Sequence, residues 1–211
     1  MIEGRRYRTK TLVVKIGSGV LLTEQGKLRR GVSQLMWEVR DLRWAGVRVL
    51  LVVSGAVSYL KTVDQVGDEA SQRISSALAW VRLARALWTQ SRYSYSIMPL
   101  LLAADERKGI WRKQEVLAIL NKSLDQGLIP VLNEFDSMHL NCFGGNDILA
   151  ARVAVLVGAD QVLILSTPEG SPRGVGGADA KDTACAMLRQ RGIDVRVVNG
   201  KTPKCITDNV M

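Results

Sequence analysis

Two lysines lie beside glycine-rich segments near opposite ends of the chain. Lys15 precedes the sequence IGSG at 16–19, and Lys181 follows the sequence GVGG at 174–177. Glycine lets backbone N–H groups approach a phosphate closely, and a lysine ammonium can neutralise the charge of a transferring phosphoryl group. The two segments therefore predict a site for a phosphorylated ligand, provided that the fold brings them together.

The glycine segments alone do not identify a nucleotide-binding fold. The chain contains neither GxxxxGK[ST] nor GxGxxG, the two common phosphate-binding motifs. A sequence such as KIGSG is more often a plain turn after a strand. Other predicted strands also end in polar residues, namely Ser54 with Gly55 and Ser166 with Thr167. Several such strand ends in one sheet indicate a binding site more strongly than any one of them.

The richest polar segment is VLNEFDSMHLNCFGGNDILA, residues 131–150. It begins as an apolar strand and ends as a helix. The turn between them carries five amides and carboxylates: Asn133, Glu134, Asp136, Asn146 and Asp147. A structural alternative for Asn146 is capping of the helix that follows it. His139, the only histidine, has no partner at metal-ligand or catalytic-triad spacing, so we interpret it as a loop residue and assign no metal ligands.

Short apolar runs alternate with helix-period segments along the whole chain. The predicted strands are 11–16, 47–53, 96–102, 128–132, 161–166 and 194–198. Most are apolar throughout, as strands buried on both faces are. Apolar residues at helical spacing predict helices around 32–42, 74–88, 116–124, 146–154 and 184–188. Gly46, Gly127 and Gly192 stand between a predicted helix and the next strand, where a left-handed residue is expected.

This alternation predicts an α/β fold, a three-layer α/β/α sandwich with a mainly parallel central sheet. We expect a single domain over 1–211, with a basic N-terminal arm at 1–10 that could be disordered, and a long exposed loop at 62–71. Ligands of open parallel sheets bind outside the carboxyl ends of the strands. The polar strand ends are therefore expected to meet at one edge.

The formal net charge of +9 and the pI near 9.8 favour an anionic partner, either a nucleotide or acidic metabolite, or nucleic acid. Nucleic acid is the weaker alternative, because the basic residues are scattered beyond the N-terminal arm. The three cysteines, Cys142, Cys185 and Cys205, show no CxxC spacing. We expect them to be buried and inert, in a reducing cytosol. No apolar run is long enough for a membrane span.

The five tryptophans fall mainly in the helix-period segments: Trp37, Trp44, Trp80, Trp88 and Trp111. We expect them in the core or at a subunit interface rather than as a platform for stacked bases.

Five sequence segments together resemble the amino acid kinase family, and most closely its glutamate-phosphorylating branch. They are VVKIGSGVL, LVVSGAV, GLIPVLNEFD, GGNDILAARVAVLVGAD and GVGGADAK, in that order along the chain. The resemblance covers almost the whole chain from Leu12 to Asp208. The segments SGAV and IP-x-x-NE-x-D are specific to this branch, whereas the first lysine is shared across the family.

The resemblance implies a role for each matching residue. Lys15 and Lys181 would be catalytic, contacting the nucleotide phosphates from two sides. The acceptor would be held by Ser54, Gly55, Ala56, Asn133, Asp136, Asn146 and Asp147. The nucleotide would also contact Gly17, Ser166, Thr167, Val175, Gly176 and Gly177.

The reaction implied by the resemblance is phosphorylation of the γ-carboxylate of L-glutamate by ATP with Mg²⁺, the first step of proline biosynthesis. A carboxylate is ionised at pH 7, so no general base is needed, and catalysis depends on positioning and charge neutralisation. The family further implies a cytoplasmic homo-oligomer, with a glutamyl-phosphate reductase as a partner. We expect no C-terminal RNA-binding-like domain here.

Several positions depart from the family pattern. Val53, Phe135, Gly145, Thr167 and Ala178 stand where the family has other residues. Only three residues, 171–173, separate Gly170 from the second glycine segment, where the family has roughly forty. Two alternatives therefore stay open: a catalytically impaired protein that binds ligands or partners, and a kinase for another amino acid or small carboxylate.

Overall fold

The strands form one six-stranded, wholly parallel sheet. In a computed structural model, which describes residues 7–54, 68–91, 96–105, 109–138, 141–168 and 177–211, the strand order is β3-β4-β2-β1-β5-β6. The strands are β1 (Thr11–Ile16), β2 (Arg48–Val53), β3 (Ile97–Leu102), β4 (Ile129–Glu134), β5 (Gln161–Ser166) and β6 (Asp194–Asn199). The predicted α/β class is confirmed. Because every pair is parallel, all six carboxyl ends lie at one edge.

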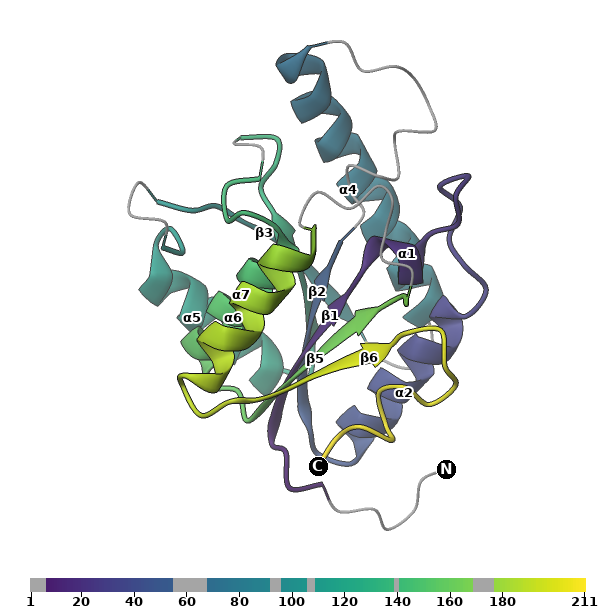
Figure 1. The fold of residues 1–211 in the computed structure, drawn as a ribbon, viewed down its shortest axis with the longest axis vertical. Helices are drawn as coiled ribbons and strands as arrows, with labels where there is room; N and C mark the ends of the chain where they lie inside the picture. Colours follow the sequence, from purple (N-terminus) through teal and green to yellow (C-terminus); the bar gives the residue numbers. More distant parts are fainter. Residues whose placement is uncertain (1–6, 55–67, 92–95, 106–108, 139–140, 169–176) are drawn as a thin grey trace.

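Helices cover both faces of the sheet (Figure 1). They are α1 (Ser18–Leu21), α2 (Val32–Trp44), α4 (Glu69–Ser91), α5 (Lys113–Asp125), α6 (Asn146–Val157) and α7 (Gly177–Arg189). Side chains of α1, α2 and α4 form one apolar cluster with the sheet, and those of α5, α6 and α7 form the other. The predicted three-layer sandwich is therefore observed.

The apolar runs located every strand to within two residues. The strand predicted at 128–132 continues to Glu134. This extension brings the polar side chains of Asn133 and Glu134 into the buried sheet. Part of the loop predicted at 62–71 is helix instead, because α4 begins at Glu69; residues 62–67 lie outside the described part. The single turn of α1 was not predicted.

Helical spacing did not identify the buried side of α4. Of the apolar residues at helical spacing, Leu87 is buried, but Ile74, Leu78, Val81 and Trp88 are exposed. Trp80 and Leu83 are buried instead. Both sides of this helix carry apolar residues, so spacing alone could not distinguish them.

The glycines predicted after three helices have the expected backbone. Gly46, Gly127 and Gly192 have φ values of 87°, 73° and 70°. Residues with a side chain disfavour this left-handed backbone region. At Gly127 a Cβ atom would also collide with the Arg43 guanidinium, whose Nε donates to the Gly127 carbonyl. The backbone conformation therefore favours glycine here, and a larger residue would also displace the Arg43 side chain.

Two buried polar side chains attach the chain ends to the sandwich. Gln161 of β5 accepts hydrogen bonds from Thr9 Oγ1 and Met211 N. Glu38 of α2 accepts from the backbone of Ile206 and Thr207. From Tyr7 onward the N-terminal arm is therefore part of the fold; residues 1–6 lie outside the description.

The tryptophans and cysteines only partly follow their prediction. Trp80 alone is buried, and the other four tryptophans are half exposed, so a core role is wrong for them. Cys185 and Cys205 are buried as expected, but Cys142 is half-buried. Burial raises the pKa of all three thiols, that of Cys205 to about 12, which disfavours the reactive thiolate. Among the described residues, no helix has the length and apolar character of a membrane span.

Candidate active site

Four polar strand ends meet at the carboxyl edge of the sheet, as predicted. β1 is followed by Gly17, β2 by Ser54, and β5 ends with Ser166. The Ser54 N–H donates to the Ile16 carbonyl at 2.9 Å, which ties the end of β2 to that of β1. The same edge holds the end of β4 and the first turn of α6.

Lys15 and Asp147 form a buried ion pair at this edge. Lys15 lies in β1, and its Nζ is 2.8 Å from Asp147 Oδ2 in the first turn of α6. Each side chain is only 8% exposed. An acidic residue in the first turn is favoured by the helix dipole. The pair therefore joins the central strand to the start of a helix 132 residues away in sequence.

Burial lowers the pKa of Lys15, because a charged ammonium loses its hydration inside the protein. Asp147 opposes this effect, and the positive charge of Lys181 adds to the lowering. Lys181 hydrogen-bonds to Ser166 at the end of β5, the strand that pairs with β1. The structure thus brings both lysines to the carboxyl edge of the sheet.

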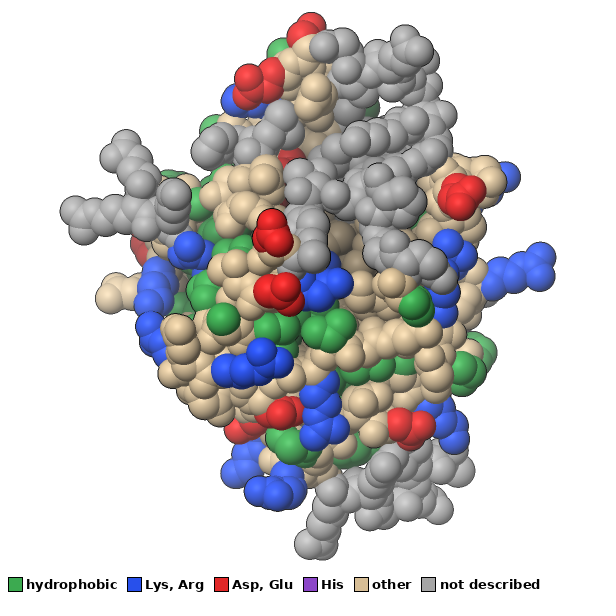
Figure 2. Space-filling view, in the orientation of Figure 1, with side chains coloured by type: hydrophobic (Ala, Val, Ile, Leu, Met, Phe, Trp, Pro, Cys, Tyr) green, Lys and Arg blue, Asp and Glu red, His purple; other side chains and the backbone are tan. Residues whose placement is uncertain are grey.

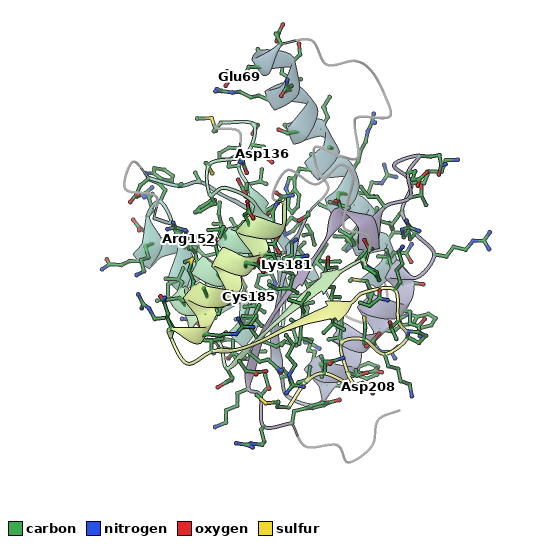
Figure 3. The ribbon with its side chains drawn as sticks, in the orientation of Figure 1. Glu69, Asp136, Arg152, Lys181, Cys185 and Asp208 are labelled. Carbon is green, nitrogen blue, oxygen red and sulfur yellow. The ribbon has the colours of Figure 1, made fainter. Side chains whose placement is uncertain are left out.

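Lys181 reaches the site from α7, which Figure 3 shows alongside the sheet. Its Nζ donates to Ser166 Oγ at 2.9 Å, and its side chain is half-buried. Thr167, which follows Ser166 directly in the chain, is buried. A neutral hydroxyl leaves the full charge of Lys181 available to an anion.

Gly17 lies against the backbone at the end of β5. Its N–H donates to the Leu165 carbonyl at 2.9 Å, and a Cβ atom at this position would lie 3.0 Å from that oxygen. A larger residue would push the two strand ends apart. Gly17 therefore holds the ends of β1 and β5 together beside Lys15.

The end of β4 and the start of α6 carry buried polar atoms without a hydrogen-bond partner among the described residues. Neither the oxygen nor the nitrogen of the Asn133 amide has such a partner, although the residue is only 1% exposed. Glu134 Oε1, Asn146 Oδ1 and Asp147 Oδ1 are in the same condition. Buried polar groups are normally hydrogen-bonded, so this group is suited to a polar ligand.

Glu134 was not predicted as a site residue, yet it connects β4 to α6. Its Oε2 accepts a hydrogen bond from the Phe143 N–H at 3.3 Å. A hydrogen bond from the Gly145 N–H also favours the charged form of the carboxylate. Burial raises the pKa of Glu134 to about 7, and the charge of Asp136 adds to this. The sequence signal that could have identified Glu134 as a site residue is its position directly after Asn133 in an apolar strand.

Asp136, labelled in Figure 3, is the second residue after the strand. It is half-buried. Its Oδ1 accepts from the Asn141 N–H at 3.0 Å. Burial raises its pKa. The carboxylate therefore stabilises the turn and stands next to Glu134.

Asn146 does not cap α6. It is the first helical residue, and Gly145 occupies the cap position, with no side-chain cap hydrogen bond. Gly145 has φ 114°, which an aspartate of the family pattern would adopt only with strain. The capping alternative for Asn146 is therefore wrong, and its Oδ1 is left for another partner.

Some predicted residues cannot be placed. Gly55, Ala56, Val175, Gly176 and His139 lie outside the described residues, and Gly177 is described only as the first residue of α7. Within the described ranges, no three His, Cys, Asp or Glu side chains are grouped to hold a metal ion.

Comparison with curated proteins gives two useful relatives. A glutamate 5-kinase from Cereibacter sphaeroides is 34% identical over 169 residues, covering 76% of this chain and 45% of the relative. A glutamate 5-kinase from Clostridium perfringens is 26% identical over 247 positions, covering 95% and 91%. The chain spans about half the length of the former. The latter alignment exceeds the 211 residues of the chain, so that relative contains internal segments missing here.

Solved structures share the fold. The UMP kinase from Ureaplasma parvum has a TM-score of 0.64 at 16% identity, covering 95% of this chain and 94% of its own. Giardia carbamate kinase has a TM-score of 0.65 at 12% identity, covering 92% and 94%. The model of the amino acid kinase family matches residues 10–170. From this match, and from the fold it shares with these kinases, the chain belongs to the amino acid kinase family.

Proposed function

We propose that this protein transfers the γ-phosphoryl group of ATP to the side-chain carboxylate of L-glutamate, the first step of proline biosynthesis. The observation that carries this is the Lys15–Asp147 ion pair at the carboxyl edge of the sheet, where Lys181 also hydrogen-bonds to Ser166 at the end of β5. Two ammonium groups on different elements suit a phosphoryl group that spreads charge over its oxygens. The 34% identity to a glutamate 5-kinase supports glutamate as the acceptor.

The chain supplies positioning and charge, not proton transfer. The acceptor carboxylate is already ionised, so it attacks the γ-phosphorus once it is held in line with the leaving oxygen. Lys15 and Lys181 reduce the repulsion between the two anions. Mg²⁺ that accompanies ATP would be held by phosphates and one or two carboxylates, and Asp147 Oδ1, which is buried and has no hydrogen-bond partner among the described residues, would be a suitable ligand.

The two ligands would occupy opposite sides of this lysine pair. Asn133, Asp136 and Asn146 would hold the amino and carboxylate groups of glutamate, with Ser54 and the backbone of Gly55 and Ala56 beside them. ATP would lie along Gly17, Ser166 and Thr167, with the segment 175–177 over its phosphates. The unpartnered amide of Asn133 supports this division.

Trapping of the acyl phosphate tests the proposed reaction. The protein is incubated with glutamate, Mg²⁺, ATP and hydroxylamine, and the hydroxamate is measured beside a Lys15→Met variant. We expect hydroxamate from the wild-type protein only, and more from glutamate than from aspartate, N-acetylglutamate or carbamate. Equal signals from the two proteins would overturn the proposal.

A catalytically impaired binding protein is the second candidate. It is favoured by the three residues that separate Gly170 from the second glycine segment, and by the longer alignment of the Clostridium relative. Thermal unfolding with and without Mg·ATP separates the two candidates, because a ligand that binds only the folded state raises the melting temperature. A melting temperature that glutamate raises and Mg·ATP leaves unchanged would favour this second function.

We further propose a cytoplasmic setting and a glutamyl-phosphate reductase as the partner that consumes the product. An acyl phosphate is readily hydrolysed, so rapid transfer to the next enzyme preserves it. Co-purification of the two proteins in the presence of glutamate and Mg·ATP would test this.

A further inference from the structure

The helix that carries Asp147 has no side-chain cap at its beginning. α6 begins at Asn146, and Gly145 in the cap position makes no side-chain hydrogen bond. The Gly145 carbonyl accepts the first bond of the helix, from the Leu149 N–H at 3.1 Å. A helix start normally needs partners for its free N–H groups. The orientation of α6 therefore depends on the groups that hold the turn before it.

Glu134 holds this turn from the end of β4. Its Oε2 accepts a hydrogen bond from the Phe143 N–H at 3.3 Å, and the Gly145 N–H hydrogen-bonds to the same carboxylate. Only 3% of Glu134 is exposed, so little water is available to replace these bonds if they are lost. One buried carboxyl group on a strand thus does for α6 what a cap residue normally does for its own helix.

The turn is also attached to α6 itself. The Phe143 side chain is buried in the apolar cluster that contains α6, and the Arg152 guanidinium of α6 lies 5.9 Å from the centre of its ring. Asp136 holds the beginning of the same turn, because its Oδ1 accepts a hydrogen bond from the Asn141 N–H. A displacement of the turn would therefore be transmitted to the first residues of α6.

The first turn of α6 determines whether Asp147 meets Lys15. Asp147 stands two residues after Gly145, and its Oδ2 lies 2.8 Å from Lys15 Nζ of β1. Both side chains are buried, where the energy of a charge pair depends strongly on distance and geometry. A slight separation of the pair would leave two poorly compensated charges in the interior. The position of α6 thus controls the buried ion pair.

We propose that Glu134 is a positioning residue of the phosphoryl-transfer site, which fixes the start of α6 so that Asp147 reaches Lys15. This inference rests on the proposed function and deepens it, because the ion pair matters to catalysis only if Lys15 acts on a phosphoryl group. Glu134 acts through two backbone N–H groups and not through its charge. A carboxyl group keeps an oxygen that accepts hydrogen bonds in both protonation states, so the hold persists on either side of its pKa of about 7.

A direct contact with the acceptor is the alternative role for Glu134. Its Oε1 is buried and has no hydrogen-bond partner among the described residues, so a bound ligand could be that partner. The two roles differ in their kinetics. A group that holds the acceptor changes the KM for glutamate, whereas a group that positions the ion pair changes mainly kcat.

Two conservative variants separate position from charge. Glu134→Gln keeps the length and an accepting oxygen but removes the charge, whereas Glu134→Asp keeps the charge and withdraws the carboxylate by one methylene. We expect kcat within about threefold of wild type for Glu134→Gln and about tenfold or more below wild type for Glu134→Asp, since a small misplacement near the reacting groups is costly. The KM for glutamate should change by less than about threefold in both. The reverse order of the two variants, or an effect confined to KM, would overturn the proposal.

Urea unfolding tests the same connection without any enzyme activity. Glu134→Asp is measured in the wild-type chain and in the Lys15→Met, Asp147→Asn double variant, which has no ion pair to disturb. We expect the unfolding equilibrium constant to rise about tenfold less in the double variant, because residues of one network have coupled effects. Equal rises in the two backgrounds would overturn the proposal.

Asp160→Glu is the matched control for the urea measurement. Asp160 Oδ2 also accepts hydrogen bonds from two consecutive backbone N–H groups, at the beginning of β1, and its replacement should cost the same in both backgrounds. A coupling for Glu134→Asp without any phosphoryl transfer would contradict the proposed reaction and still support the hold of Glu134 on the ion pair. A coupling of the same size for Asp160→Glu would overturn that hold.

Discussion

The two lysines of the site are held in different ways. Lys15 lies on a central strand, buried, with a carboxylate at 2.8 Å. Lys181 lies half-buried on α7 with a hydroxyl at 2.9 Å. A buried ammonium must keep its counter-ion, whereas a half-buried one can exchange a hydroxyl for a phosphate oxygen. Lys15 therefore belongs to the framework as well as to the site, and Lys181 belongs mainly to the site.

Removing the Lys15 charge should have the largest effect on both stability and activity. Lys15→Met leaves the Asp147 carboxylate buried without a cation, so we expect the free energy of unfolding to fall by about 3–5 kcal/mol. Phosphoryl transfer should fall by about 10²–10³-fold. Urea denaturation and steady-state kinetics measure the two effects.

The double variant Lys15→Met with Asp147→Asn is the control. Neutralising Asp147 removes the unpaired charge, so much of the lost stability should return while activity stays low. If Lys15→Met alone were as stable as wild type, the ion pair would not stabilise the fold.

Removing the Lys181 charge should separate the two effects. Lys181→Met loses one hydrogen bond to a neutral hydroxyl, worth about 1 kcal/mol or less in stability. The rate should still fall by about 10²-fold, because the second cation at the phosphoryl group is gone. Urea denaturation and steady-state kinetics again measure the two effects. A loss of stability equal to that of Lys15→Met would contradict the proposed difference between the two lysines.

Glu134 extends the comparison to a carboxyl group whose negative charge is disfavoured by burial and by Asp136. Its pKa is raised from 4.5 to about 7, so between these values the unfolded chain releases the proton while the folded chain keeps it. Stability therefore falls as pH rises from about 4.5 to 7, by about 3 kcal/mol for this group. Glu134→Gln should lose that part of the decline when unfolding is measured by urea across this range. Glu24→Gln, at an exposed position, is the control and should keep the wild-type slope.

The sheet could be predicted from sequence because its strands are buried on both faces. In the run TLVVKI at 11–16 only apolar residues stand between Thr11 and Lys15, and the structure buries all six residues. The position of Lys15 at the carboxyl edge followed directly. α4 was different, because its two apolar sides have the same period and only packing shows which one faces the sheet.

The partners within the site could not be predicted by local patterns. The Lys15–Asp147 pair joins residues 132 positions apart, and the role of Glu134 depends on backbone N–H groups of a turn nine to eleven residues away. Asn146 shows the opposite case. Its local signal favoured a helix cap, but Gly145 with φ 114° took that position. Contacts across the fold decided each of these roles.

Figure 2 shows Lys and Arg side chains spread over several parts of one face, so overall charge does not single out Lys181; its hydroxyl partner does. Ser166→Ala tests that partner and should have the smallest effect. Without Ser166 Oγ the Lys181 ammonium stays charged but is less well oriented. We expect a rate reduction of about fivefold, since one hydrogen bond is worth about 1 kcal/mol, and stability within about 0.5 kcal/mol of wild type. Ser33→Ala is the matched control, because Ser33 Oγ also makes a hydrogen bond, to the Arg30 carbonyl beside the start of α2. A rate loss as large as that of Lys181→Met would show that Ser166 contacts the nucleotide itself, and the contrast between a framework lysine and an oriented one would then rest on Lys15 alone.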